Sequence, residues 1–436
     1  MLSAYHDQLI NIRRQLHQNP EEGWSEFTTT AFLVTTLRGY GYDVLLGRKV
    51  IDPEACLGRE ESVVKAGLER ARRNGVSEEL LAEMEELTGC VAVLDTGRPG
   101  PTLAIRFDID CVPVTECTDE THVPAKEGFI SKNPGFMHAC GHDAHMAMLL
   151  SLADYLNDMS MGLAVAHWVM DNKDKLSGKI KILFQPAEEG VRGAAGMAAS
   201  GVLDDCDYFL GSHVAMSAKS GEIATNLYGY LCTTKLDVTF HGKPAHAGAC
   251  PQDGRNALAA AANATVQMMG ISRHSGGMTR INVGQLIAGE GRNVIPSKAV
   301  MKLEVRGETG EINQYMVDQV TNICKGVALG FGVTYEMRKM GEAVDLTADQ
   351  ELVDILNAAG RATPGITVVD KALNFGGSED ATILARRVQA HGGKAAFFLW
   401  GSDRPSGHHT ATFDIKESDL DPALEVWTHI IPSILK

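Results

Sequence analysis

The chain has 436 residues, 44% of them hydrophobic and 22% charged, so it is long enough for two or three domains and has the composition of a globular protein. Its 55 acidic residues outnumber its 40 Lys and Arg, and the net charge of −15 argues against a nucleic-acid-binding protein. No uncharged apolar run is long enough to predict a membrane span, and residues 1–16 lack the apolar core of a signal peptide, so we expect a cytoplasmic protein.

The first part of the chain is predicted to be mainly helical. Helical spacing and turn residues predict helices over 4–17 and 25–40 and a short strand over 44–46. Residues 50–88 resemble an inserted helical hairpin, because charged, helix-favouring residues fill 60–73 and 77–87 on either side of Asn74-Gly75. Its charges are interpreted as a solvated face, and we assign it no chemistry.

Three predicted strands lead directly into acidic residues or a histidine. After a strand over 90–94, the strands over 102–107, 179–184 and 208–210 continue into Asp108-Ile109-Asp110, Gln185-Pro-Ala-Glu-Glu-Gly190 and Gly211-Ser212-His213. Open α/β sheets bind their ligands at the carboxyl ends of their strands. We therefore expect these side chains to share one site.

Between these strands, residues 137–145 place one cysteine, three histidines and one aspartate in nine positions, ahead of an apolar run that looks helical. Thiolate and imidazole ligands favour zinc, whereas manganese is favoured if carboxylates complete the site. Gly141 allows a sharp turn that points Cys140 and His142 at one spot. A buried cysteine among surface histidines is the alternative, but unpaired polar groups are costly to bury, so a metal site is favoured. The nine cysteines are scattered and odd in number, which predicts reduced thiols.

The adjacent acids Glu188 and Glu189 follow an apolar strand and a proline in a loop that ends in glycine. Such pairs are common on protein surfaces, but this context favours a functional role. Successive side chains point to different sides, so one carboxylate can bind metal while its neighbour acts as a general base towards water.

Between residues 231 and 338 the predicted elements follow the order β-α-β-β-α-β of a ferredoxin-like sandwich. Strands are predicted over 235–240, 280–287, 299–306 and 333–337, and helices over 256–269 and 312–329. We expect this small domain to interrupt a catalytic domain made of residues 1–230 and 339–436. The returning chain is predicted to hold a helix over 349–361, the loop 375–380, a strand over 395–400, His408-His409 and a final helix from about residue 418.

Four motifs together carry a family resemblance. They are Met-His-Ala-Cys-Gly-His-Asp at 137–143, Pro-Ala-Glu-Glu-Gly at 186–190, Gly-Lys-Pro-Ala-His-Ala-Gly at 242–248 and Arg-Asn-Val-Ile-Pro at 292–296. Over nearly its whole length the chain resembles the bacterial and plant amidohydrolases of the aminoacylase and glutamate carboxypeptidase superfamily. Within that group it is most similar to aminobenzoyl-glutamate hydrolases, which carry a like insertion, and to indole-3-acetyl-aspartate hydrolases.

The resemblance implies an α/β fold and a hydrolase. The expected architecture is a catalytic domain with a mostly parallel central sheet, interrupted by a ferredoxin-like lid and dimerisation domain. The expected reaction is metal-dependent cleavage of the amide in an N-(aromatic acyl) acidic amino acid, such as indole-3-acetyl-aspartate or p-aminobenzoyl-glutamate. The motifs do not choose between these two substrates.

The resemblance also implies two divalent metal ions per subunit, Mn²⁺ or Zn²⁺. The implied ligands are Cys140, His142, Glu189, His213 and His409, with Asp110 orienting one of them. Cys140 would bridge the ions where the wider superfamily uses an aspartate. His409 is selected by its spacing from Phe413-Asp414, although Thr410 replaces the asparagine of relatives and His408 remains a rival.

By the same resemblance, Glu188 takes a proton from the attacking water and returns it to the leaving amine. His246 is implied to donate to the oxyanion from the small domain of a partner subunit, which predicts a homodimer. Without the resemblance, His246 would be interpreted as a plain turn residue between Pro244 and Gly248.

Arg306 and Asn293 match positions that bind the substrate's α-carboxylate, and Arg292 is the candidate for a second carboxylate. Each alone could be a solvated surface residue. Residues 376–380 are expected to line the acyl pocket, with a helix N-cap by Ser378 as the alternative or additional role.

Two other functions stay open. The first is a broader N-acyl-amino-acid or hippurate hydrolase. The second is an inactive metal-binding subunit in a hetero-oligomer with a homologous chain, but the presence of both Glu188 and Glu189 argues against an inactive site. In each case we expect a small-molecule substrate and neither a nucleic acid nor a membrane as partner.

Overall fold

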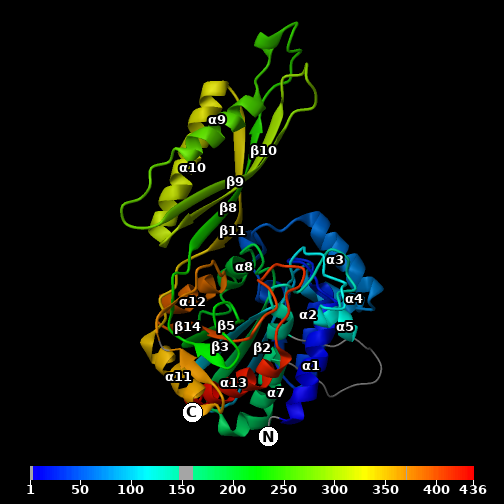
Figure 1. The fold of residues 1–436 in the computed structure, drawn as a ribbon, viewed down its shortest axis with the longest axis vertical. Helices are drawn as coiled ribbons and strands as arrows, with labels where there is room; N and C mark the ends of the chain where they lie inside the picture. Colours follow the sequence, from blue (N-terminus) through cyan, green and yellow to red (C-terminus); the bar gives the residue numbers. More distant parts are fainter. Residues whose placement is uncertain (1–2, 147–160, 370) are drawn as a thin grey trace. The chain divides into compact units, whose positions relative to one another are not determined.

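The computed structural model describes residues 3–146, 161–369 and 371–436. The chain forms two compact units (Figure 1). Unit 1 comprises Met1–Tyr228, Leu346–Phe375 and Asp380–Lys436, and unit 2 comprises Gly229–Asp345 and Gly376–Glu379. Unit 2 therefore begins slightly before and ends slightly after the predicted small domain, and it takes in part of the 375–380 loop.

Unit 1 is built on an eight-stranded mixed sheet. In chain order its strands are β1 (Asp43–Leu45), β2 (Cys90–Asp95), β3 (Thr102–Asp108), β4 (Lys179–Gln185), β5 (Tyr208–Val214), β6 (Glu222–Ala224), β12 (Thr367–Val369) and β14 (Lys394–Trp400). The spatial order is β1-β2-β4-β3-β5-β14-β6-β12. The central strands β4, β3, β5 and β14 are parallel, whereas β2 is antiparallel to β4 and β6 is antiparallel to β14. The α/β prediction is confirmed, and the parallel arrangement of the four central strands is supplemented by a parallel pair, β6 and β12, at one edge of the sheet.

Helices cover this sheet and supply its core. They are α1 (Ser3–Gln18), α2 (Phe27–Gly39), α3 (Glu61–Arg73), α4 (Glu78–Met84), α5 (Val123–Glu127), α6 (His142–Met146), α7 (Met161–Asn172), α8 (Ala194–Ala199), α11 (Gln350–Ala362), α12 (Ala381–Ala390) and α13 (Leu420–Ile434). The central strands are apolar along almost their whole length because both faces are covered. On α13, the buried Trp427 packs its ring against Phe107 of β3 and Phe398 of β14. The helix predicted after His145 is described only as far as Met146, and its continuation over 147–160 lies outside the described residues.

The inserted segment 50–88 packs onto the N-terminal part of unit 1. It contains a short 3₁₀ helix, α3 and α4, with Gly67 of α3 so close to Ser25 that a Cβ atom would lie 2.9 Å from that residue's backbone. Arg70 donates hydrogen bonds to Glu21 and to the Ser25 carbonyl. The prediction of a purely solvated charged face is therefore wrong at Arg70, because this arginine holds the insertion in place.

Unit 2 has the β-α-β-β-α-β order of a ferredoxin-like sandwich. Its elements are β8 (Cys232–His241), α9 (Ala257–Met269), β9 (Thr279–Ala288), β10 (Lys298–Gly307), α10 (Gly310–Phe331) and β11 (Thr334–Ala343). The strands form an antiparallel sheet in the order β11-β8-β10-β9. Figure 1 shows α9 and α10 side by side, and the buried alanines of α9, among them Ala260 and Ala264, let the elements approach closely.

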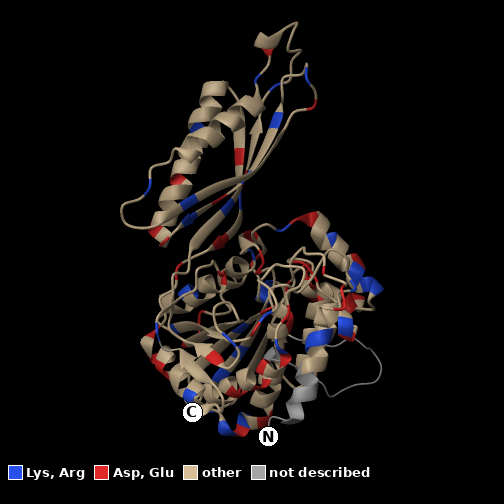
Figure 2. Cartoon of the chain, in the orientation of Figure 1, with Lys and Arg blue, Asp and Glu red and all other residues tan. Residues whose placement is uncertain are grey.

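Acidic and basic residues are interspersed along the helices and strands of each unit rather than segregated by sign (Figure 2). Among the described helices, none has the length and apolar character needed to cross a bilayer. All nine cysteines are free thiols, in agreement with the sequence prediction.

Candidate metal centre and active site

The parallel strands of unit 1 bring the predicted chemistry to one edge of the sheet. Asp108 at the end of β3 pairs with Gln185 at the end of β4, just before the loop that carries Glu188 and Glu189. On the other side of β3, β5 extends through His213 to Val214. Adjacent parallel strands end at the same edge, so residues far apart in the sequence meet there.

The segment that carries Cys140 needs its glycine. Gly141 has a φ of +89°, a left-handed conformation that glycine adopts without penalty. A Cβ atom at this position would also lie 2.4 Å from the Val214 side chain. The turn at Gly141 presents Cys140 and starts α6 at His142, as the sequence predicted for a sharp turn here.

The candidate ligand atoms fall into overlapping groups. Those of Cys140, His213 and His408 lie within 4.8 Å of one another, and so do those of Cys140, Glu189 and His409. The Cys140 Sγ atom is 3.5 Å from His213 Nε2. One thiol therefore belongs to two groups, which is the geometry that a bridging ligand requires.

His142 joins the same cluster from the start of α6. Its ligand atom groups with those of Glu188 and Glu189 within 4.8 Å, and its Nε2 is 3.8 Å from Glu188 Oε2. His409 Nε2 is 3.2 Å from Glu189 Oε1. The structure thus brings all the predicted ligands of unit 1 together, and it gives His408 and His409 different neighbours.

Asp110 contacts two of these residues without entering a group itself. The His142 Nδ1–H donates to the Asp110 carbonyl at 2.9 Å, and the Glu189 backbone N–H donates to Asp110 Oδ2 at 2.9 Å. With Nδ1 occupied, His142 presents Nε2 to the cluster. Asp110 is placed where an orienting residue would act.

His145 and Asp108 have a role that the sequence did not reveal. His145 Nδ1–H donates to Asp108 Oδ1 at 2.6 Å, and its Nε2 accepts from the Val214 backbone N–H at 2.9 Å. Although His145 lies close to His142 and His213, both its ring nitrogens are already engaged. His145 therefore braces the cluster rather than completing it, and its spacing of three residues from His142 on a helix was the available signal.

Buried charged side chains hold the segment that carries His142. We call this set the Asp143 clamp, and its members are Arg13, His17, Glu116, Asp143 and Asp414. Arg13 Nε and His17 Nδ1 both contact Asp143 Oδ2 at 2.8 Å, and Arg13 Nη2 contacts Asp414 Oδ1 at 2.5 Å. His17 Nε2 contacts Glu116 Oε1 at 2.8 Å. The clamp ties α1 both to the residue after His142 and to the segment that follows His409.

The electrostatics of the cluster suit cations. The Nε2 atoms of His142 and His408 are buried and, within the described part of the chain, make no hydrogen bond. Burial and the neighbouring histidines hold the pKa of His213 well below its usual range, so its ring is neutral. Burial and the Glu189 carboxylate raise the pKa of the Cys140 thiol. Buried ligand atoms of this kind fit metal ions, which would also promote loss of the thiol proton.

In unit 2, His246 and Asn293 are neighbours. A β-bridge joins His246 to Val294, and the Ala247 N–H donates to the Asn293 carbonyl. The backbone N–H groups of Gly248 and Ala249 donate to His246 Nδ1, at 3.1 and 3.0 Å. The exposed ring therefore carries its proton on Nε2 and is able to donate there. Asn293 and the adjoining Arg292 are also exposed.

Arg306 lies near the end of β10, at the opposite end of this strand from the loop that holds Asn293. It follows Lys298, the first residue of β10, by eight positions, and at about 3.3 Å per residue this separation spans roughly 26 Å. Its guanidinium pairs with Glu304, at 3.1 and 3.3 Å. Within one copy of unit 2, Arg306 is thus remote from the loop that holds Asn293.

Residues 376–380 are divided between the units. Ser378 Oγ donates to the Leu231 carbonyl, and α12 begins at Ala381 with Asp380 as its N-cap residue, so the alternative of a cap by Ser378 is wrong. Asp380 is buried and accepts hydrogen bonds from the Gly193 and Ala194 N–H groups. Asp380 thereby holds the loop after Glu189, and its ligand atom lies within 4.8 Å of those of Glu188 and Glu379.

Comparisons with known proteins agree with this geometry. The model of Peptidase family M20/M25/M40 matches residues 104–433. The chain is 50% identical to a Haemophilus influenzae protein named as a homolog of a p-aminobenzoyl-glutamate hydrolase subunit, covering 98% of this chain and 99% of that one. It is 42% identical to the indole-3-acetyl-aspartic acid hydrolase of Enterobacter agglomerans, covering 98% and 96%. A crystal structure of an aminobenzoyl-glutamate utilization protein from Klebsiella pneumoniae matches with a TM-score of 0.83 and 36% identity, covering 99% and 97%.

Proposed function

We propose that this chain, which belongs to peptidase family M20/M25/M40, cleaves the amide bond of N-(aromatic acyl) acidic amino acids. The family match and the hydrolase relatives show a metal-dependent amidohydrolase. Two relatives are named for p-aminobenzoyl-glutamate and indole-3-acetyl-aspartic acid, and both compounds join an aromatic acyl group to an acidic amino acid. The observation that carries the proposal is the membership of Cys140 in two ligand groups with Glu188 beside them.

The proposed cofactor is a pair of divalent cations. The proposed ligands are Cys140 as the bridge, His142, Glu189, His213 and His409. His408 remains a rival, because its buried Nε2 faces the group of Cys140 and His213 while its Nδ1 contacts Arg404. A thiolate ligand favours Zn²⁺, and the carboxylate suits Mn²⁺.

When bound, such cations would polarise the amide carbonyl and lower the pKa of a water molecule. Glu188 is the proposed general base. It is 8% exposed, and its Oε2 lies 3.8 Å from His142 Nε2, at the edge of the ligand cluster. It would accept the proton of the attacking water and deliver it to the nitrogen of the leaving amino acid, so that the amine departs neutral.

The oxyanion donor is proposed to be His246 of a second copy of the chain. His246 and Asn293 lie at one end of unit 2 and Arg306 at the other, so all three can act on one substrate only if they come from two copies. Strand β9 lies at the edge of the described sheet, so one side of its backbone has no neighbouring strand there. It exposes Leu286 and Ile287, whose exposed fractions are 37% and 65%. Both features support a homodimer.

Substrate carboxylates are proposed to bind to Arg306 and Asn293, with Arg292 reading the side-chain carboxylate of the acidic amino acid. Arg292 and Asn293 are exposed and adjacent, and a guanidinium is suited to bidentate recognition of a carboxylate. A site built for two carboxylates should reject a glycine conjugate by about 10–100-fold, because the guanidinium would lose one charged partner.

The test is an assay of the purified protein, loaded with Mn²⁺ or Zn²⁺, on p-aminobenzoyl-glutamate, indole-3-acetyl-aspartate and hippurate. We expect the acidic conjugates to have the higher kcat/KM. Equal or better hydrolysis of hippurate would replace the proposal by a broader N-acyl-amino-acid hydrolase. If none of the three is cleaved by the metal-loaded protein, the alternative of an inactive partner chain is favoured, and co-purification with a homologous chain should then restore turnover.

A further inference from the structure

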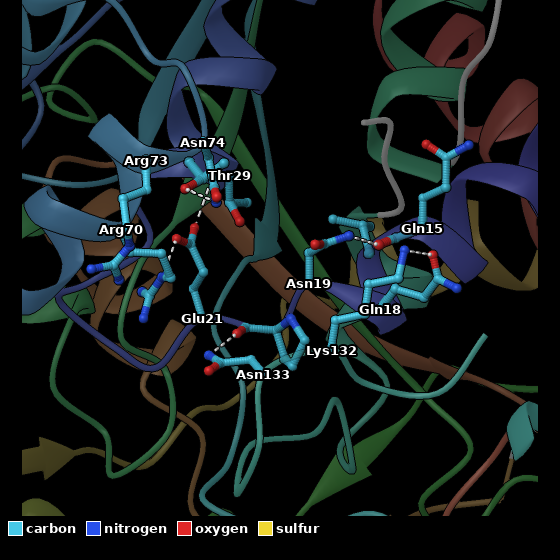
Figure 3. A pocket seen from close by; sticks show the side chains of 13 residues that line it. Gln15, Gln18, Asn19, Glu21, Thr29, Arg70, Arg73, Asn74, Lys132 and Asn133 are labelled. Atoms are coloured by element: carbon cyan, nitrogen blue, oxygen red, sulfur yellow. Dashed lines mark hydrogen bonds and ion pairs between the residues drawn. The ribbon is translucent and has the colours of Figure 1, made fainter. Parts of the chain in front are cut away.

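Unit 1 contains a cavity that the proposed hydrolysis does not use. It has a volume of about 270 Å³, and its lining includes Gln18, Glu21, Arg70, Arg73, Lys132 and Asn133. Its walls are the end of α1, the start of α2, the last turn of α3 and the segment at 132–133. Figure 3 shows Arg70 and Arg73 on one side and Gln18 and Lys132 on the other, with Glu21 between them. We call it the α1–α3 pocket.

Charge is unbalanced in the α1–α3 pocket. Arg70 is matched by Glu21, whose Oε1 accepts its Nε–H at 3.0 Å. Lys132 Nζ donates only to the neutral Gln18 Oε1 at 3.0 Å, and Arg73 is exposed. Among the described residues, neither Lys132 nor Arg73 has a carboxylate partner. Two positive charges therefore remain uncompensated around one small cavity, in a chain whose net charge is −15.

The walls of the pocket are held in place by hydrogen bonds among the residues that line it. Asn133 Nδ2 donates to the Pro20 carbonyl at 2.9 Å, Asn74 Nδ2 donates to Thr28 Oγ1 at 3.3 Å, and Glu21 Oε2 accepts from the Thr29 N–H at 2.8 Å. The cavity is thus preformed, and a ligand would not have to order its walls on binding. Its volume lies just below the range of about 300–1,000 Å³ that is typical of sites for drug-sized ligands, so it suits a small metabolite.

We propose that the α1–α3 pocket binds a small dicarboxylate. One carboxylate would pair with Arg73 on α3 and the other with Lys132 on the opposite wall, which neutralises both cations. Such a ligand would bridge the inserted segment and the chain that leads into Met137–Met146. The inference does not rest on the proposed hydrolysis, because no residue of the pocket belongs to the metal cluster.

The pocket is also connected to the metal cluster by backbone contacts. The Glu21 carbonyl accepts a hydrogen bond from the Cys111 N–H at 3.0 Å. Cys111 follows Asp110, which accepts from the Glu189 N–H. A ligand that tightens the pocket wall would therefore stabilise a segment that ends at the metal site.

The test is calorimetric titration of the full-length protein with succinate, with acetate and inorganic phosphate as comparators at matched ionic strength. We expect succinate to bind and both Arg73→Gln and Lys132→Gln to weaken that binding by about tenfold, because each variant removes one charge-assisted contact. Arg72→Gln is the matched control, since Arg72 lies in the same helical turn but pairs with Glu78 outside the pocket. Arg72→Gln should leave the affinity for succinate within about twofold of the wild type, because an exposed charge outside the pocket contributes little to binding.

Three results would overturn the proposal. The first is succinate binding no stronger than acetate binding. The second is succinate affinity that Arg73→Gln and Lys132→Gln leave unchanged, which would place the ligand elsewhere, including at the catalytic centre. The third is phosphate binding that exceeds succinate binding and is lost in the same two variants, which would replace the dicarboxylate by phosphate as the ligand class. Circular dichroism of each variant, all at exposed or half-buried positions, separates these results from misfolding.

Discussion

The residues predicted to bind metal and those predicted to bind substrate differ in how the fold holds them. The candidate metal ligands of unit 1 are brought together by parallel strands and braced by Asp110, His145 and the Asp143 clamp, and all but the exposed His409 are buried or half-buried. His246 and Asn293 of unit 2 are exposed and lie at one end of a sheet, while Arg306 lies at the other. Within a single chain, the proposed metal ligands lie close together, whereas the proposed substrate-binding residues do not. If the proposed roles hold, bond cleavage depends on unit 1, and we expect substrate recognition to depend on the assembly of two copies.

The strongest test of this contrast is to separate metal binding from proton transfer inside the cluster. We expect Glu188→Gln to reduce kcat by about 10³–10⁴-fold while both metal ions remain bound, because it removes only the general base. The neighbouring substitution Glu189→Gln should instead lower the bound metal, since it removes a ligand. Elemental analysis with single-turnover assays checks both, and loss of metal in Glu188→Gln would make Glu188 a ligand.

A second test compares two adjacent arginines of α1. Arg13 is fully buried between Asp143 and Asp414, whereas Arg14 is 29% exposed and pairs with Glu417 near the surface. We expect Arg13→Gln to cost about 3–5 kcal/mol of unfolding free energy, because it leaves buried carboxylates unpaired. Arg14→Gln should cost about 1 kcal/mol or less.

Denaturant unfolding of the metal-loaded variants measures both values under the same conditions. Equal costs for the two substitutions would mean that the Asp143 clamp does not brace the metal segment. A large loss of unfolding free energy in Arg13→Gln, together with weaker metal binding, would show that contacts from α1 keep the candidate metal ligands in place. It would sharpen the contrast with the exposed residues of unit 2.

The third test concerns unit 2. We expect His246→Ala to reduce kcat by about 10²–10³-fold with the dimer and the metal content unchanged, because it removes an oxyanion donor. Mixing it with Glu188→Gln should restore about a quarter of wild-type activity if subunits pair randomly and each active site draws on both copies. Absence of such recovery, after subunit exchange has been verified, would place His246 outside the partner's site.

The sequence predicted those features whose residues are close together in the chain. The cluster at 137–145 and the Glu188-Glu189 pair were visible as local patterns. Each strand that was predicted begins within a few residues of its predicted start. The Asp143 clamp was not visible, because Arg13 is 130 residues from Asp143 and 401 from Asp414. The antiparallel direction of β2 and the remoteness of Arg306 from Asn293 also depend on strand pairing, which local patterns do not encode.

A pH dependence of stability is also expected from the clamp. Both ring nitrogens of His17 face carboxylates, Asp143 at one and Glu116 at the other, so the ring is held as an imidazolium. Burial alone would lower the pKa of His17, but the hydrogen bonds to Asp143 and Glu116 outweigh it and raise the pKa to about 9. The Arg13 guanidinium opposes this rise, and Glu116 also contacts His122.

A folded-state pKa above the unfolded value of about 6.5 stabilises the protein fully below pH 6.5, and this contribution is lost as the pH rises through about 9. The difference between the two pKa values corresponds to about 3 kcal/mol of stability. We therefore expect the unfolding free energy of the wild type, minus that of His17→Gln, to decline between pH 6.5 and 9.5. A difference that stays constant across this window would show that His17 is neutral in the folded protein, and the clamp would then owe its strength to Arg13 alone.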